Sequence, residues 1–156
     1  MTFDDVLRFI NLLAAGLQAG ILVAVIAAVM PAMLSLPDGT ALRFKQTFDP
    51  LVDRVNPGAV MVALVTGILI LIVADDLTTT AKVFTVIGII GMAGVAATSL
   101  GINMPINRQM AKWSLDAPPD EFRPLIERWQ KSHAVRTLSG LTGFVGFLIG
   151  VIAVID

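Results

Sequence analysis

The segment VNPGAVMVALVTGILILIVA, from Val55 to Ala74, contains 20 consecutive residues without a charged side chain. A helix needs about 20 apolar residues to cross roughly 30 Å of hydrocarbon. Its polar and apolar residues do not alternate, as they would in a strand of a membrane barrel. Because backbone groups inside hydrocarbon must bond to one another, the segment predicts a transmembrane helix.

Three further charge-free segments have similar lengths: 9–37, 83–107 and 137–155. The composition agrees, since 56% of the residues are hydrophobic and only 15% are charged, whereas about a quarter are charged in an average soluble domain. We therefore predict an all-α protein, a four-helix transmembrane bundle forming one integral membrane domain over residues 1–156. The expected spans are approximately 6–35, 56–75, 80–106 and 133–155.

The two longer connections differ in character from the spans. Residues 38–54 are predicted to form an amphipathic helix with Phe44, Phe48, Leu51 and Val55 on one side. No helix breaker separates Leu125 from Thr137, so the fourth helix is expected to be extended, from about residue 120 to 154. Asn56 is expected to cap the second span, and Thr78, Thr79 and Thr80 the third.

The distribution of positive charge predicts the orientation. Nine of the 11 lysines and arginines lie in the two longer connections and only Arg8 and Lys82 lie on the opposite side. The positive-inside rule therefore predicts that both termini lie outside. The expected location of the protein is the cell (inner) membrane. The net charge of −1 gives no indication of a nucleic-acid partner.

The fourth helix carries an informative face, because seven residues recur at spacings of three and four and so form one stripe. The glycines of this stripe are typical of close helix contacts in membranes, so the stripe is expected to face the bundle. Two interpretations remain open for its polar end: an interfacial tryptophan, a snorkelling arginine and a capping histidine, or a functional pocket. The stripe consists of Trp129, His133, Arg136, Gly140, Gly143, Phe147 and Gly150.

The third helix supplies a matching polar face, with Ser99, Asn103 and Asn107 spaced by four residues. Pro105 cannot donate to the carbonyl of Gly101, which leaves that carbonyl seeking another donor. The chain reverses between the third and fourth helices, so both polar sets fall at the same end of the bundle. We expect His133 within one hydrogen bond, or one bridging water, of Asn103 or Asn107. The alternative is that the asparagines only bond across helices.

The first helix has Asn11 and Gln18 on one face, and both are expected to bond to neighbouring helices. Gly16 and Gly20 form a GxxxG pattern that is expected to mark close packing. Pro31 is expected to kink this helix, with the neighbouring methionines serving in packing.

Several functional classes are disfavoured. The chain has no cysteine and one histidine, which excludes thiolate metal sites and sites with several imidazoles. The four charge-free segments that form the intramembrane parts of the helices contain no Asp, Glu or Lys, which argues against an ion pump or proton relay. We predict no metal and no cofactor, with a haem on His133, and Met104 opposite, as the alternative.

Two motifs resemble those of a known family. Met104-Pro105-Ile106-Asn107, followed by Trp129, His133 and Arg136, resembles the P-x-N and W-x3-H-x2-R patterns of the anthrone oxygenase-like family of small four-helix membrane proteins. Gly16-Leu-Gln-Ala-Gly20 and Met30-Pro31-Ala resemble the first-helix pattern of the same family. The resemblance covers nearly the whole chain, and Phe48-Asp49-Pro50 departs from it where an asparagine is expected.

The resemblance implies a cofactor-independent monooxygenase that oxidises a hydroxylated anthrone to an anthraquinone with dioxygen. It implies His133 as the base and Arg136 as the partner of the substrate anion. Ser99, Asn103 and Asn107 would bind substrate oxygens, and Trp129 would stack on the ring. Alternatives are a non-enzymatic membrane protein that binds a lipid or quinone, one that assembles with a larger complex or with itself, and a haem protein.

Overall fold

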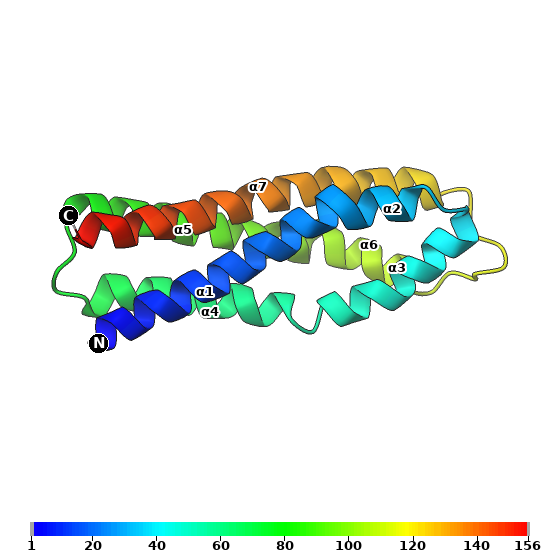
Figure 1. Cartoon of the computed structure of the whole chain (residues 1–156). Helices are drawn as coiled ribbons and strands as arrows, with labels where there is room; N and C mark the ends of the chain where they lie inside the picture. Colours follow the sequence, from blue (N-terminus) through cyan, green and yellow to red (C-terminus); the bar gives the residue numbers. More distant parts are fainter. Residues whose placement is uncertain (1, 156) are drawn as a thin grey trace.

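The computed structural model describes residues 2–155, and this part of the chain is an all-helical bundle with no strand. Four antiparallel helical rods run side by side, and the two termini lie at the same end (Figure 1). The rods comprise α1 (Phe3–Ala24), η1 (Val25–Val29) and α2 (Met30–Leu34); α3 (Asp38–Val52) and α4 (Asn56–Val73); α5 (Thr79–Thr98), η2 (Ser99–Asn103) and α6 (Met104–Met110); and α7 (Phe122–Ile155).

Each rod is long and apolar enough to cross a membrane, which makes this a membrane protein with four spans. The rods contain 32 to 36 residues, or about 50 Å at 1.5 Å per residue, and so exceed the roughly 30 Å of hydrocarbon. Each predicted span overlaps one rod, and the first two spans extend to residues 35 and 75, just beyond the rod ends at Leu34 and Val73. The ends formed by α2, α3, α6 and the start of α7 lie together, away from the termini (Figure 1). The charged helix α3 therefore lies beyond the apolar span formed by α4.

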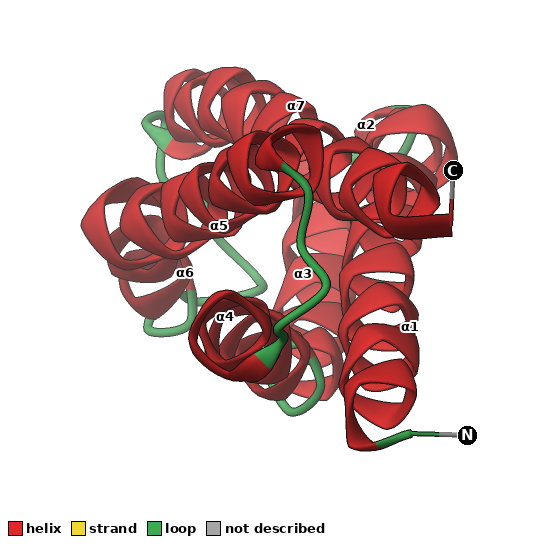
Figure 2. Cartoon of the chain, turned by 90° about the vertical axis from the view of Figure 1, so that its left-hand side faces the viewer, coloured by secondary structure: helices red, strands yellow, loops and turns green. Residues whose placement is uncertain are grey.

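The glycines of α5 and α7 bring these two helices into close contact, as Figure 2 shows from the terminal end. A Cβ atom on Gly91 would lie 2.5 Å from the backbone nitrogen of Gly143, and one on Gly146 would lie 2.7 Å from that of Gly88. All seven residues of the stripe on α7 are buried. The prediction that this stripe faces the bundle is confirmed, and the continuous α7 is confirmed with it.

Two five-residue π-helical segments, η1 and η2, each precede a Met-Pro pair. In each segment the backbone N–H at the end donates to the carbonyl five residues earlier, from Met30 to Val25 and from Met104 to Ser99. A π turn is wider than an α turn and commonly occurs at functional sites. The backbone change around Pro31 and Pro105 thus takes the form of a π turn that ends two residues before each proline.

The predicted amphipathic helix is present as α3, and its apolar side faces outward. Phe44, Leu51 and Val55 are exposed, and Phe48 is only partly buried. The buried side carries Ala41, Leu42 and Lys45 instead. At the edge of a bilayer the outer surface of the bundle is itself apolar, so the apolar side of α3 faces outward and a polar side chain turns inward.

Three expectations for single residues need correction. Asn56 is the first residue of α4 and makes no cap, while Thr78 does cap α5 by accepting from the N–H of Ala81 at 3.1 Å. Gly20 is exposed, and no atom of another helix lies within 4 Å of its Cβ position, whereas a Cβ atom on Gly16 would lie 3.2 Å from the ring of Phe144, so only Gly16 of the GxxxG pattern makes a close contact. Gln18 makes no bond across helices through its buried Oε1. Asn11 does, since its Nδ2 donates to the carbonyl of Ala63 at 2.8 Å.

Candidate functional site

Three successive inward-facing residues of α7 form the centre of the candidate site. Trp129, His133 and Arg136 are 4%, 0% and 8% exposed. The rings of Trp129 and His133 stack almost in parallel, with 4.8 Å between their centroids. These residues are four and then three positions apart, and such residues lie on one face of a helix, so the three side chains stand one above another.

The hydrogen bonds of His133 determine its tautomer. Nε2 lies 3.1 Å from the carbonyl oxygen of Leu22 on α1, and Nδ1 lies 2.8 Å from Nη2 of Arg136. A carbonyl can only accept and a guanidinium can only donate. His133 is therefore neutral, with its proton on Nε2 and the lone pair of Nδ1 directed at Arg136. Both ring nitrogens are engaged.

The expected hydrogen bond between His133 and an asparagine of the third rod is wrong. Asn103 instead accepts from the hydroxyl of Ser132 at 2.7 Å, and Asn107 accepts from Nε1 of Trp129 at 2.8 Å. The reason is that Nε2 of His133 bonds instead to α1, at the carbonyl of Leu22, which lies shortly before η1. The two polar faces still meet, through Trp129, Ser132 and Arg136.

Arg136 is a buried cation that forms no ion pair with any carboxylate among residues 2–155. Its Nη1 donates to Oγ of Ser99 at 3.2 Å and its Nη2 to His133, while its Nε has no partner. Burying a charge without a counter-charge is costly. This guanidinium is therefore held in place with one donor group left over, as an anion-binding site requires.

A cavity of about 270 Å³ adjoins Arg136, between α4 and the η2–α6 segment. Four buried side-chain polar atoms lack a partner in the described part of the chain, and three of them belong to residues that line this cavity: Gln18, Asn56 and Arg136. Its volume is near the lower end of the range for ligand pockets, about 300–1,000 Å³. The other lining residues are Asp53, Pro57, Val60, Met61, Ala96, Ser99, Leu100, Asn103, Met104 and Asn107.

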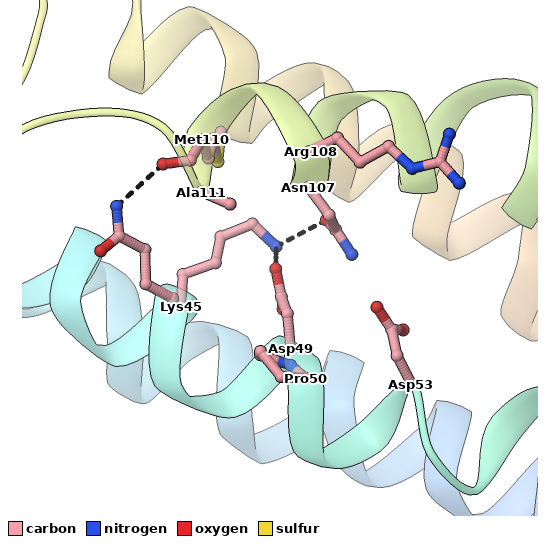
Figure 3. Close-up of a pocket in the computed structure, with 9 residues that line it drawn as sticks. Lys45, Asp49, Pro50, Asp53, Asn107, Arg108, Met110 and Ala111 are labelled. Atoms are coloured by element: carbon pink, nitrogen blue, oxygen red, sulfur yellow. Dashed lines mark hydrogen bonds and ion pairs between the residues drawn. The ribbon is translucent and has the colours of Figure 1, made fainter.

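Lys45 is a functional candidate that the sequence analysis missed. It is 2% exposed, and its Nζ lies 2.8 Å from Oδ2 of Asp49, 3.0 Å from Oδ1 of Asn107 and 4.1 Å from the ring centroid of Trp129. Figure 3 shows Lys45 extending from α3 towards both oxygens. A second pocket of about 140 Å³ lies here and shares Asp53 and Asn107 with the cavity.

Burial governs the electrostatics of this pair, which lies on α3 outside the spans. Burial lowers the pKa of Lys45 while Asp49 opposes that change, and burial raises the pKa of Asp49 while Lys45 opposes it. The sequence contains a pattern that could have identified Lys45 and Asp49 as candidates. Four polar residues follow one another at spacings of four, four and three: Lys45, Asp49, Asp53 and Asn56. Lys45 and Asn56 of this series are buried and Asp53 is exposed at the turn between α3 and α4, and each of the four lines one or both of the two pockets.

The structure separates the six predicted site residues into two groups. Ser99, Asn103, Asn107 and Arg136 line the cavity. Trp129 and His133 do not line it, but lie behind Arg136 and Asn107 and bond to them. Within residues 2–155, no three His, Asp or Glu side chains are grouped as a metal site requires.

Comparison with protein families identifies a match: the family model described as anthrone oxygenase matches residues 44–146. The matched region contains both the Met-Pro-Ile-Asn motif and the Trp129, His133 and Arg136 positions, whereas the first-helix motif lies before it. No match was found among curated proteins or among solved structures.

Proposed function

The chain belongs to the anthrone oxygenase family, and on that premise we propose that it is a membrane oxygenase acting with dioxygen on a hydrophobic, hydroxylated polycyclic aromatic of the anthrone type. One observation carries the proposal beyond family membership. Arg136 lines a cavity with largely apolar walls, and the N–H group at its buried Nε has no partner. Such a site favours an aromatic molecule whose oxygen becomes negatively charged during the reaction.

The chemistry requires no external reductant. Loss of a proton from the methylene carbon of an anthrone gives an enolate, which transfers one electron to dioxygen. Recombination forms a carbon–oxygen bond, and the resulting hydroperoxide loses water to give the ketone. One anthrone and one dioxygen thus yield one anthraquinone and one water. The protein must stabilise the enolate, accept a proton and keep the site dry.

The contacts support a specific division of roles. Arg136 stabilises the enolate oxygen, and the unpartnered amide oxygens of Gln18 and Asn56 accept from substrate hydroxyl groups. His133 acts through Arg136, because both of its ring nitrogens are already engaged. Asp53 is the proposed proton acceptor, because among residues 2–155 it is the only carboxylate that lines the cavity.

The roles of the other predicted residues follow from their bonds. Asn103 accepts at Oδ1 from Ser132 and donates from Nδ2 to the carbonyl of Trp129, so it forms part of the wall. Asn107 accepts at Oδ1 from Trp129 and Lys45, and its Nδ2 is the proposed donor to a substrate oxygen. Ser99 orients Arg136. A haem iron would require a free imidazole nitrogen, which His133 does not offer, so the proposal includes no cofactor.

The test is turnover of 1,8-dihydroxyanthrone by the full chain in lipid nanodiscs, measured as dioxygen uptake and anthraquinone absorbance. Arg136→Gln should lower kcat by about 10²–10³, the usual effect of removing one donor to a developing anion. Arg8→Gln is the matched control, because Arg8 is equally buried, at 8% exposure, but lies at the opposite end of the bundle and pairs with Asp76.

Undiminished turnover in Arg136→Gln would refute the assigned role. If the wild-type protein binds the anthrone, or a quinone, without consuming dioxygen, the chain is a binding protein rather than an oxygenase. The same preparation thus separates the enzymatic proposal from the lipid- or quinone-binding alternative.

A further inference from the structure

We propose that the cavity beside Arg136 opens sideways into the bilayer between α4 and η2, and that the aromatic ligand enters from the lipid with its oxygen-bearing edge first. This inference rests on the proposed function and specifies the route and the class of substrate. The ligand is a molecule that partitions into hydrocarbon and carries its polar groups along one edge.

The mouth of the cavity is formed by side chains on the outer surface of the bundle. Met61 and Leu100 both line the cavity, and they are 59% and 66% exposed. Met61 lies 12 residues before Val73 in the sequence, about 18 Å along α4, which is within the thickness of the hydrocarbon. The surface to which these side chains are exposed is therefore lipid, not water.

The lining combines exposed apolar side chains with buried polar ones. Met61 and Leu100 stand at the outer end, with Val60 and Ala96 also contributing apolar wall. The unpartnered atoms of Gln18, Asn56 and Arg136 are all buried. A ligand that enters with its apolar end first would leave those atoms unsatisfied and place its own oxygens in hydrocarbon, and each such group costs free energy.

The mouth lies on the seam of the bundle that can open most readily. α5 packs most extensively on α7, and α1 on α4, whereas the contact between α4 and α5 is smaller. The close backbone contacts of Gly91 with Gly143 fix α5 against α7.

Closing the mouth reversibly tests the route. The chain has no cysteine, so Met61→Cys/Leu100→Cys provides a unique pair that a reductant-cleavable bifunctional thiol reagent can join. The control is Leu138→Cys/Leu141→Cys on the outer face of α7, where neither residue lines the cavity. Vesicles of phosphatidylcholine containing each protein are mixed with vesicles loaded with 1,8-dihydroxyanthrone. Dioxygen uptake and quenching of tryptophan fluorescence are then followed.

Crosslinking the first pair should slow quenching and uptake by at least about tenfold, as expected when a gating step is blocked. Cleaving the link with reductant should restore both rates, which shows that the protein stayed folded, and the control pair should change less than about twofold. Unchanged rates in the crosslinked protein would overturn the proposal.

The outcomes also separate this inference from the proposed function. If the link slows quenching but no variant consumes dioxygen, the lateral route stands and the oxygenase proposal fails. If uptake is unaffected by the link but lost in Arg136→Gln, the oxygenase proposal stands and the lateral route fails. If the wild-type protein shows no quenching and no uptake, both are overturned.

Discussion

Replacing His133 with glutamine distinguishes a positioning role from that of a base. The imidazole donates from Nε2 to the carbonyl of Leu22 and accepts at Nδ1 from Arg136. A glutamine amide offers both a donor and an acceptor, so it can replace both bonds, but it is not a base at any accessible pH. His133→Ala replaces neither bond.

The magnitudes follow from these contacts. In His133→Ala, the carbonyl of Leu22 and Nη2 of Arg136 each lose a partner in a site with 0% exposure, at about 1–3 kcal/mol per unsatisfied group. His133→Gln keeps those bonds and loses the stacking on Trp129, worth about 0.5–1.5 kcal/mol. We therefore expect His133→Gln to retain turnover within about tenfold of the wild type, since about 1.4 kcal/mol corresponds to a factor of ten.

The assay measures turnover of 1,8-dihydroxyanthrone together with thermal unfolding of each variant in the same detergent. His133→Ala should lose both activity and several degrees of thermal stability. If His133 is instead the base, its loss removes the roughly 10²–10⁴-fold contribution typical of general base catalysis, and a folded His133→Gln would be as inactive as His133→Ala. That result would refute the positioning role.

Three further predictions concern stability and orientation. Gly91→Ala should cost about 1–3 kcal/mol because its Cβ meets backbone atoms of α7, whereas Gly20→Ala, in open space, should not lower the unfolding temperature. Lys45→Met should cost about 3–5 kcal/mol by leaving Asp49 buried without its partner, and adding Asp49→Leu should recover most of this in the same thermal assay. A Ser114→Cys variant should react with an impermeant maleimide only from the cytoplasmic side, and reaction only from outside would reverse the proposed orientation.

Much of the bundle could be predicted because its two strongest signals are local in the sequence. Charge-free segments define the spans, and the periodic stripe on α7 identifies the buried face, including Trp129, His133 and Arg136. These signals depend only on helix geometry and on the cost of charge in hydrocarbon. They do not depend on which helices are neighbours.

What the sequence could not predict depends on neighbours. The bond from His133 to Leu22 joins residues 111 positions apart, and nothing in the sequence indicates which backbone carbonyl will accept from a buried imidazole. The amphipathic pattern of α3 does not by itself say which side of the helix faces the bundle. In a bilayer the outer surface is the apolar one, so Lys45 and Asp49 were overlooked as members of the site.

The two π-helical segments each hold one residue more than the same turn of an α-helix would. Five residues of a π turn rotate the chain by about as much as four residues of an α-helix, which turn by about 100° each. Deleting one residue within η1 would therefore convert the wide turn into an ordinary α turn and leave the buried Met30 and Met33 on the same side of the helix. Deleting one residue within α2 or α6 would instead rotate the residues that follow by about 100°. Homologous sequences should consequently tolerate the loss of one residue across 25–29 or 99–103 more readily than across 30–34 or 104–110.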